Sequence, residues 1–193
     1  MNTDNRPSMA EFFNWHHHPF ADTHPMTDIF LSAKDARLKD RALSMLACGK
    51  NLALCGPSGT GKSTLIGHLM GLLDPNCYKP VLLHYAGFNR SGLLRAIADR
   101  LGVDTNGRST PLLIRLQKHL LQLTGSTNSL YPVLFVDDAQ MLETESMLDL
   151  CALMVSADKK TTAASIVMTG DDTLRSRFQL AAMAAIRTRL TAI

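Results

Sequence analysis

The stretch GPSGTGKST, residues 56–64, decides the fold of this 193-residue chain, because it matches the pattern G-x-x-x-x-G-K-S/T in full. The apolar run NLALC (51–55) before it is typical of a short buried strand, and STLIGHLMGLL (63–73) after it is typical of an apolar helix. A glycine-rich loop between a strand and a helix is the context in which this pattern binds phosphate groups. The alternative is a glycine-rich turn with a chance lysine, and the coincidence of motif, strand and helix disfavours it.

The chemistry of this loop suits the phosphates of a nucleotide. Gly56, Gly59 and Gly61 are expected to let the backbone turn tightly and aim N–H groups inward, next to the N-terminus of the helix. Lys62 is expected to reach the β- and γ-phosphates, and the Ser63 hydroxyl to ligate Mg²⁺. The predicted nucleotide-binding residues are Gly56, Pro57, Ser58, Gly59, Thr60, Gly61, Lys62, Ser63 and Thr64.

Two adjacent acids end the stretch LFVDDAQ, residues 134–140, where the apolar run of a predicted strand stops at Val136. A buried carboxylate is costly unless something positive meets it, and the phosphate loop with Lys62 is the expected partner. Asp137 is predicted to hold Mg²⁺, usually through water. Asp138 is predicted to polarise the attacking water as a general base. The alternative for Asp138 is a solvated strand end or a helix cap.

A polar residue also ends the predicted strand ASIVMTG, residues 164–170. In P-loop ATPases with an extra strand between the phosphate loop and the acidic strand, this position, here Thr169, carries a sensor of the γ-phosphate. The alternative is an ordinary β-branched residue at a strand end. The guanine-specifying pattern N/T-K-x-D is absent, so the predicted cofactors are ATP and Mg²⁺.

Strands alternate with helices along the chain, which predicts βαβ units and an α/β fold with a mostly parallel sheet covered on both faces. The additional strands are expected at 80–86 and 131–136, and the helices at 35–47, 91–102, 111–123, 143–156 and 173–187. The final residues, RLTAI, are read as the start of a fifth strand. On the last helix, Arg175 and Arg177 are expected to face solvent, with contact to DNA phosphates as the alternative.

The composition is that of an ordinary globular domain, with 46% hydrophobic and 19% charged residues. A net charge of +3 is weak evidence for nucleic-acid binding. No apolar run approaches about 18 residues, which predicts no membrane span. The N-terminus has no secretory signal, and the cysteines show no C-x-x-C pair, which predicts reduced thiols in a cytoplasmic protein.

Five stretches occur in the order seen in ExeA-like AAA+ ATPases, and the chain resembles that family over nearly its whole length. They are FFNWHHHPF (12–20), NLALCGPSGTGKST (51–64), LFVDDAQ (134–140), IVMTGDDTL (166–174) and AAIRTRL (184–190). The family counterparts are an F-F/Y-x…P-F opening, the phosphate loop, an I/V-D-E-A-Q strand, G-x-x-x-L and L-R-x-R-I/L. The resemblance implies a P-loop NTPase fold, a three-layer α/β/α sandwich with the AAA+ strand order 5-1-4-3-2.

The resemblance also implies a division of the chain. Residues 1–34 would form an irregular segment near the nucleotide site, and residues 35–193 the AAA+ P-loop ATPase core, truncated before the C-terminal helical lid. Within the first segment Phe12, Phe13 or Phe20 would pack near the base or, equally, anchor in the core.

The family includes secretion-pathway ATPases and ATP-dependent helpers of DNA transposases of the TniB type. The stretch at 73–103 resembles the transposition branch, and the membrane helix of the secretion members is missing. The implied function is an AAA+ ATPase that helps DNA transposition, with a homo-oligomer, a transposase and double-stranded DNA as partners. The alternatives are an ATPase that energises secretion and a small-molecule kinase with the same phosphate loop.

Two features of the resemblance bear on catalysis. Asp138 stands where the family usually has glutamate, and its shorter side chain predicts slow hydrolysis. Arg187 and Arg189 occupy the R-x-R positions, which implies an arginine finger that reaches the γ-phosphate of a neighbouring subunit, with Arg189 as the first choice. The alternative is a surface helix end, where cations suit the helix dipole.

Overall fold

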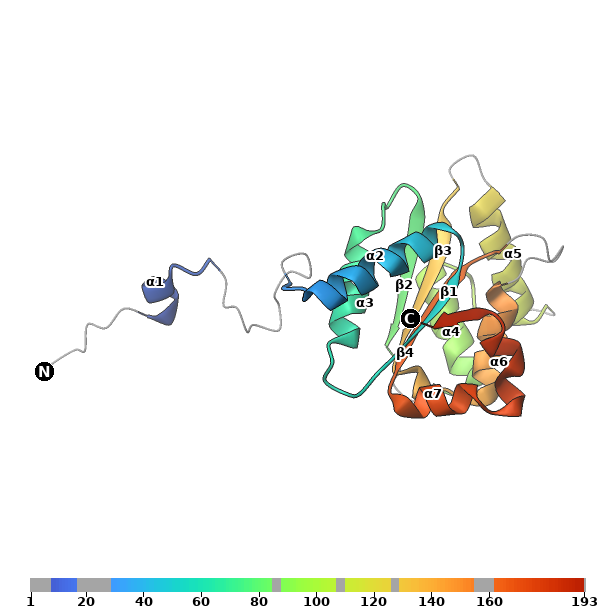
Figure 1. Ribbon diagram of the computed structural model, residues 1–193. Coiled ribbons are helices and arrows are strands. Elements are labelled where there is room, and N and C mark those ends of the chain that lie inside the picture. Colours follow the sequence, from blue (N-terminus) through green and yellow to red (C-terminus); the bar gives the residue numbers. More distant parts are fainter. Residues whose placement is uncertain are drawn as a thin grey trace, which may run out of the picture.

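The computed structural model describes residues 8–16, 29–84, 88–106, 110–125, 129–154 and 162–192. Five strands form one sheet in the order β2-β3-β4-β1-β5, and every neighbouring pair is parallel (Figure 1). The strands are β1 (Asn51–Cys55), β2 (Tyr78–His84), β3 (Tyr131–Asp137), β4 (Ser165–Gly170) and β5 (Leu190–Ala192). The predicted fold class and the predicted strand order are therefore confirmed, including the fifth strand.

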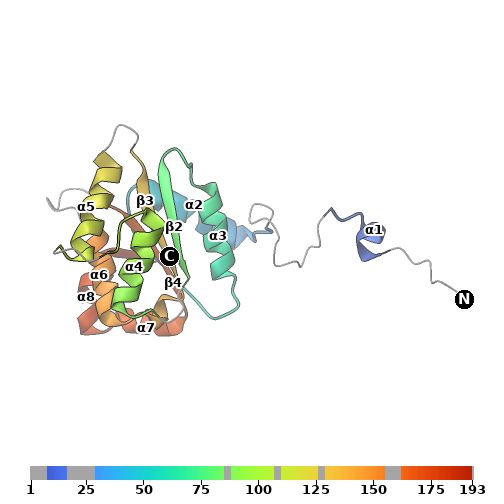
Figure 2. The ribbon, with the colours of Figure 1, turned by 180° about the vertical axis from the view of Figure 1, so that it is seen from behind.

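Helices cover both faces of the sheet (Figures 1 and 2). One face packs against α2 (Ala33–Ala47) and α3 (Lys62–Leu72). The other face packs against α4 (Arg90–Leu101), α5 (Leu112–Gly125), α6 (Thr144–Met154), α7 (Asp172–Phe178) and α8 (Ala184–Arg187). Two 3₁₀ helices, η1 (Ala139–Met141) and η2 (Ala181–Met183), lie in the connections.

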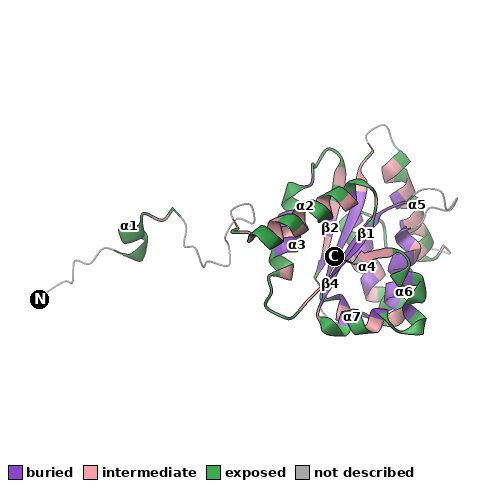
Figure 3. Ribbon diagram, viewed as in Figure 1, coloured by how far each residue is buried: buried purple, intermediate pink, exposed green. Residues whose placement is uncertain are grey.

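The strand sequences explain why two helical layers are needed. Side chains alternate between the faces of a strand, so a strand whose residues are all apolar must be covered twice. In β3, Val133 and Phe135 pack with α2 and α3, whereas Leu134 and Val136 pack with the helices of the opposite face. The central strands are buried along their length (Figure 3).

Short-range signals set the helix ends. Ser32 accepts a hydrogen bond from the backbone N–H of Asp35 and begins α2, two residues before the predicted start. Asn89 caps α4 in the same way, and Gly102 ends it in the left-handed conformation. These caps fix the helices that flank the phosphate loop and the β2 edge.

The predicted helix at 173–187 is wrong as a single element. The chain instead forms α7, η2 and α8, with an extended Leu180 between the first two. No glycine or proline marks this break in the sequence. The Arg187 guanidinium helps to stabilise it, because its Nη1 donates to the carbonyl oxygens of Phe178 (3.0 Å) and Gln179 (3.3 Å), which end α7.

The N-terminal segment is not wholly irregular, because Met9–Phe13 forms the short helix α1 with a capping box between Ser8 and Glu11. No residue of α1 is buried, and Phe12 and Phe13 are exposed, so neither anchors in the core. Phe20 lies outside the described residues. The boundary at residue 35 stays a prediction.

Two predictions concern the whole chain. In the described part, no helix has the length and apolar character that crossing a membrane requires. The four cysteines, Cys48, Cys55, Cys77 and Cys151, form no disulfide in the structure, and their reduced state stays a prediction.

Candidate functional site

The loop after β1 presents backbone donors to a pocket at the carboxyl edge of the sheet. Gly59 and Gly61 have φ of +79° and +80°, a region that glycine adopts without steric cost. Gly61 is the N-cap of α3 and supplies no side chain to cap it, so the first N–H groups of α3 remain available for an anion. Gly56 lies outside the left-handed region, and a Cβ there would meet Thr60 Oγ1 at 3.6 Å, an ordinary contact.

Lys62 is the first residue of α3, and its side chain folds back over the phosphate loop. Its Nζ donates to the carbonyl oxygens of Gly56 (2.9 Å) and Pro57 (2.8 Å). Among the described residues it forms no ion pair with Asp137 or Asp138, so the predicted pairing of the acids with the phosphate loop, through Mg²⁺ and phosphates, stays a prediction. The ammonium is held at the pocket wall by the loop itself, where a phosphate can exchange for the carbonyl contacts.

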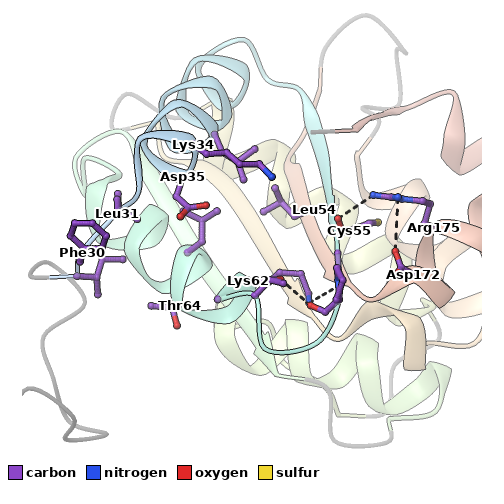
Figure 4. Close-up of a pocket in the computed structure, with 17 residues that line it drawn as sticks. Phe30, Leu31, Lys34, Asp35, Leu54, Cys55, Lys62, Thr64, Asp172 and Arg175 are labelled. Carbon is purple, nitrogen blue, oxygen red and sulfur yellow. Dashed lines mark hydrogen bonds and ion pairs between the residues drawn. The ribbon is translucent and has the colours of Figure 1, made fainter.

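The pocket has a volume of about 600 Å³ and two chemically different ends (Figure 4). The loop residues and Lys62 form the cationic, donor-rich end. The start of α2 and the residues before it form the other end, where apolar side chains stand beside the charged Lys34 and Asp35; the apolar ones are Ile29, Phe30, Leu31 and Leu38. The lining includes neither Phe12 nor Phe13, and the aromatic residue at this end is Phe30, which is 93% exposed.

Asp137 ends β3, an inner strand next to the edge strand β2, and is buried. Its Oδ1 accepts hydrogen bonds from the hydroxyl of Thr169, at the end of β4, and from the backbone N–H of Asp138 at 3.1 Å. Its Oδ2 lies 3.9 Å from Nδ1 of His84, the register partner at the end of β2. Thr169 is fully buried, so its hydroxyl orients Asp137 in this arrangement.

Asp138 is exposed and has a left-handed backbone, with φ of +51°. This conformation is uncommon for residues other than glycine and costs roughly 1 kcal/mol, and such strain concentrates at functional sites. Asp138 is the N-cap of η1 but makes no side-chain capping bond there, so the helix-cap alternative is not supported. Its Oδ1 instead accepts from Nε2 of Gln140 at 3.0 Å.

The donor set fits a magnesium ion carried in with a nucleotide. The described residues contain no group of three or more His, Cys, Asp or Glu side chains that could hold a metal alone. Mg²⁺ prefers oxygen ligands and is usually bound by one or two carboxylates together with substrate phosphates. Asp137 offers a buried carboxylate, and Ser63 offers an exposed hydroxyl in the first turn of α3. These two residues would hold the ion.

Neither Arg187 nor Arg189 lines this pocket, although Arg187 lines a smaller neighbouring cavity together with Cys55 and Arg175. Arg187 donates to the carbonyls that end α7, and Nη1 of Arg189 donates to the carbonyl oxygen of Ala185 at 2.7 Å. Arg189 directly precedes β5, whose first residue, Leu190, pairs with Asn51 at the start of β1. The phosphate loop follows the opposite end of β1. Arg189 and the phosphate loop of one chain are therefore at opposite edges of the sheet.

Sequence reasoning missed three residues of the site. Arg175 is exposed, as expected, but it also lines the pocket, with Nη2 3.4 Å from the carbonyl oxygen of Cys55 and Nη1 3.9 Å from Oδ1 of Asp172 (Figure 4). Phe30 and His84 carry no motif, and only the packing of α2 and the β2–β3 register place them. The one signal that could have found His84 is the predicted parallel sheet, in which the end of β2 would lie beside the end of β3 and therefore beside Asp137.

Cys55 also lines the pocket, between β1 and the loop. Burial raises the pKa of its thiol, and Arg175 and Lys62 oppose this only in part. The thiol is therefore protonated near neutral pH and is a poor nucleophile.

Comparison with known proteins identifies a matching family and solved structures with a similar fold. The family described as AAA domain matches residues 49–178, which is more than half of the chain. Cdc6p from Pyrobaculum aerophilum is 18% identical with a TM-score of 0.66, over 90% of this chain and 48% of that protein. The Aeropyrum pernix ORC2 protein, solved as ADPNP-ADP complexes, is 14% identical with a TM-score of 0.59, over 89% and 50%.

A third structure, the Aeropyrum pernix ORC1 protein in complex with DNA, is 15% identical with a TM-score of 0.56, over 86% of this chain and 46% of that protein. Identities this low show a shared fold alone. This chain spans about half of the length of these three proteins. No curated protein matches the sequence.

Proposed function

This chain belongs to the AAA domain family, and on that premise we propose that it binds ATP with Mg²⁺ and hydrolyses it to ADP and phosphate. The observation that carries the proposal is the pocket of about 600 Å³, whose loop end suits phosphates and whose other end offers apolar side chains on which a base could pack. The exposed acid Asp138 follows β3, two strands from the loop, at the same edge of the sheet.

The residues of the chain divide the work as follows. The N–H groups of the loop and α3, with Lys62, bind and orient the β- and γ-phosphates. Asp137, held by Thr169, and Ser63 would hold Mg²⁺, which when bound neutralises phosphate charge. Asp138 accepts a proton from water as the water oxygen bonds to the γ-phosphorus and the bond to the β–γ bridging oxygen breaks, releasing ADP.

The proposal is tested by ATP turnover without any acceptor. The parent is expected to release phosphate from ATP and water, whereas a small-molecule kinase would release little until its acceptor is added. Lys62→Ala is expected to lower the affinity for a fluorescent ATP analogue by about 10- to 100-fold, because it removes a charged donor to the phosphates.

Lys118→Ala, on the exposed face of α5, is the matched control and should bind as the parent does. If Lys62→Ala binds within about twofold of the parent, the loop is not the phosphate site. The unfolding temperatures of both variants are measured as well. If they equal that of the parent, a lower affinity reports a loss of binding and not a loss of folding.

We further propose that the ATPase acts as a helper of DNA transposition, in a homo-oligomer with a transposase and double-stranded DNA. The support is the resemblance of the five motifs to ExeA-like AAA+ ATPases and of residues 73–103 to the transposition branch of that family. One solved structure with this fold is a complex with DNA, which is a property of that protein. The alternative in which the ATPase energises secretion shares the nucleotide chemistry but does not need DNA.

A DNA-binding measurement separates these two roles. Double-stranded DNA is titrated with the protein at several salt concentrations, with and without a non-hydrolysable ATP analogue. The transposition role predicts binding that strengthens with the analogue and weakens steeply with salt, since phosphate contacts release counterions. Equal and negligible binding in both conditions would leave the secretion role as the better proposal.

A further inference from the structure

Gln140 is the side chain that holds the carboxylate of Asp138. It lies two residues further on, within η1, and its Nε2 donates to Asp138 Oδ1 at 3.0 Å. The opposite orientation of the amide would place its oxygen against a carboxylate oxygen, so the contact itself fixes which atom is the nitrogen. No hydrogen bond to Asp138 Oδ2 comes from the described residues, so this oxygen can accept a proton from water.

The rest of the amide is pressed against the end of β4. A Cβ built at Gly170 would lie 2.7 Å from Gln140 Oε1 and 2.5 Å from Leu174 Cδ2, so only glycine leaves room here. Gln140 Oε1 is buried and has no hydrogen-bond donor among the described residues. A buried acceptor without a donor costs free energy, about 1–3 kcal/mol in typical cases.

The backbone of Gln140 is held as firmly as its side chain. Arg177 of α7 donates from Nη1 to the carbonyl oxygen of Gln140 at 2.6 Å. The same helix carries Arg175 at the wall of the nucleotide pocket. Gln140, which lies within η1, is therefore held in place by the end of β4 and by α7.

Packing alone does not explain an amide at this position. A methionine has a similar length and would contact Gly170 and Leu174 without burying an unpaired oxygen. What only the amide supplies is the N–H on Asp138, whose strained backbone leaves its carboxylate exposed and otherwise unheld among the described residues.

From this arrangement we infer that Gln140 is a positioning residue for Asp138. It fixes the carboxylate with one oxygen so that the other faces the water, and it ties that carboxylate to the Thr169 strand and to α7. This inference rests on the proposed ATPase activity, in which Asp138 accepts the proton of the attacking water. Gln140 itself touches no reacting atom.

Gln140→Met is the decisive variant, because it keeps the length and removes the N–H donor. The expected result is a fall in kcat of about tenfold or more, with the affinity for an ATP analogue and the unfolding temperature close to parental, because misplacing one group loses orientation rather than binding. Gln140→Glu, which puts a second carboxylate against Asp138, is expected to lower kcat at least as far.

Gln117→Met is the matched control, because the Gln117 amide also makes one hydrogen bond, to the carbonyl oxygen of Ala152 at 2.9 Å, far along the chain in α5. It should leave kcat unchanged. Gly170→Ala provides a second route to the same effect, since its methyl group would displace the Gln140 amide, and it should lower kcat in the same way.

The outcomes separate the two proposals. If the parent shows no ATP turnover, the proposed activity fails and the inference falls with it. If the parent turns over and Gln140→Met has parental or raised kcat, the activity stands and the positioning role is overturned. Equal losses of kcat and of unfolding temperature in Gln140→Met and Gln117→Met would show a structural role instead, which also overturns it.

Discussion

Asp138 shows how much a single residue depends on its surroundings. Its side chain is exposed, and a solvated aspartate at a strand end would be unremarkable chemically. Its left-handed backbone and the amide of Gln140 give its carboxylate a defined direction, beside the buried Asp137 that the Thr169 hydroxyl holds. The two acids thus occupy different environments, which suits two different roles, one at the metal and one at the water.

Asp138→Asn tests this division of roles. We expect the variant to bind ATP as the parent does and to lose turnover by about 10²- to 10⁴-fold, since the amide keeps the shape but cannot accept the proton of water. Turnover is measured by phosphate release and binding by titration with a fluorescent analogue. Asp138→Glu keeps an acceptor with longer reach and should turn over at least as fast as the parent. Parental turnover in Asp138→Asn would assign the water to another group.

At the scale of elements, the break between α7 and α8 determines where the Arg187 side chain lies. If residues 173–187 formed one straight helix, Arg187 would not reach the carbonyl oxygens of Phe178 and Gln179. The extended Leu180 lets Met183 and Ile186 turn into the core, and both are fully buried. The burial of these two apolar side chains and the capping by Arg187 together stabilise the break.

Arg187→Ala is therefore expected to lower the free energy of unfolding by about 1 kcal/mol, because it leaves two carbonyl oxygens at the end of α7 without a protein donor. For a chain of this size the unfolding temperature should fall by about 2–4 °C, measured by thermal denaturation. Arg95→Ala, on the exposed face of α4, is the control and should change stability little. No change in Arg187→Ala would show that core packing alone sets the break.

At the scale of the whole molecule, the parallel pairing of β1 and β5 separates Arg189 from the phosphate loop. Asn51 pairs with Leu190, so Arg189 lies at the start of β1, five residues from its end at Cys55. Five strand residues span roughly 16 Å. We propose that Arg189 acts on the nucleotide of a neighbouring subunit, which requires the homo-oligomer proposed above, and Arg187 is the less favoured choice because two carbonyls already engage it.

An arginine finger in another subunit makes the ATPase activity depend on assembly. Activity per subunit should rise with protein concentration, and Arg189→Ala should lower kcat by about 10³-fold or more if the finger stabilises the transferring phosphate. A mixture of Arg189→Ala and Lys62→Ala chains should regain part of the activity, because some interfaces combine an intact finger with an intact loop. A rate independent of concentration, unchanged by Arg189→Ala, would contradict the assembly.

The sequence by itself determined the layers, the strands and the phosphate loop. Apolar runs that are buried on both faces can be recognised in the sequence, and G-x-x-x-x-G-K-S/T between a strand and a helix is typical of a phosphate-binding loop. The strand order 5-1-4-3-2 followed from the family resemblance, and the observed pairing confirms it. The roles of Lys62, Asp137 and Asp138 remain predictions, although the structure places the acids and the loop at one edge of the sheet.

The tertiary structure alone decided what each of these residues touches. Arg177 hydrogen-bonds Gln140, which is 37 residues away in the sequence, and Thr169 hydrogen-bonds Asp137, which is 32 residues away. No local sequence pattern could predict either contact. The break after Gln179 carries no glycine or proline, and Phe30 joins the pocket only because α2 packs beside β1. Periodicity and motifs record the burial of a segment and its local turns, whereas the pairing of side chains depends on how separate segments come together in space.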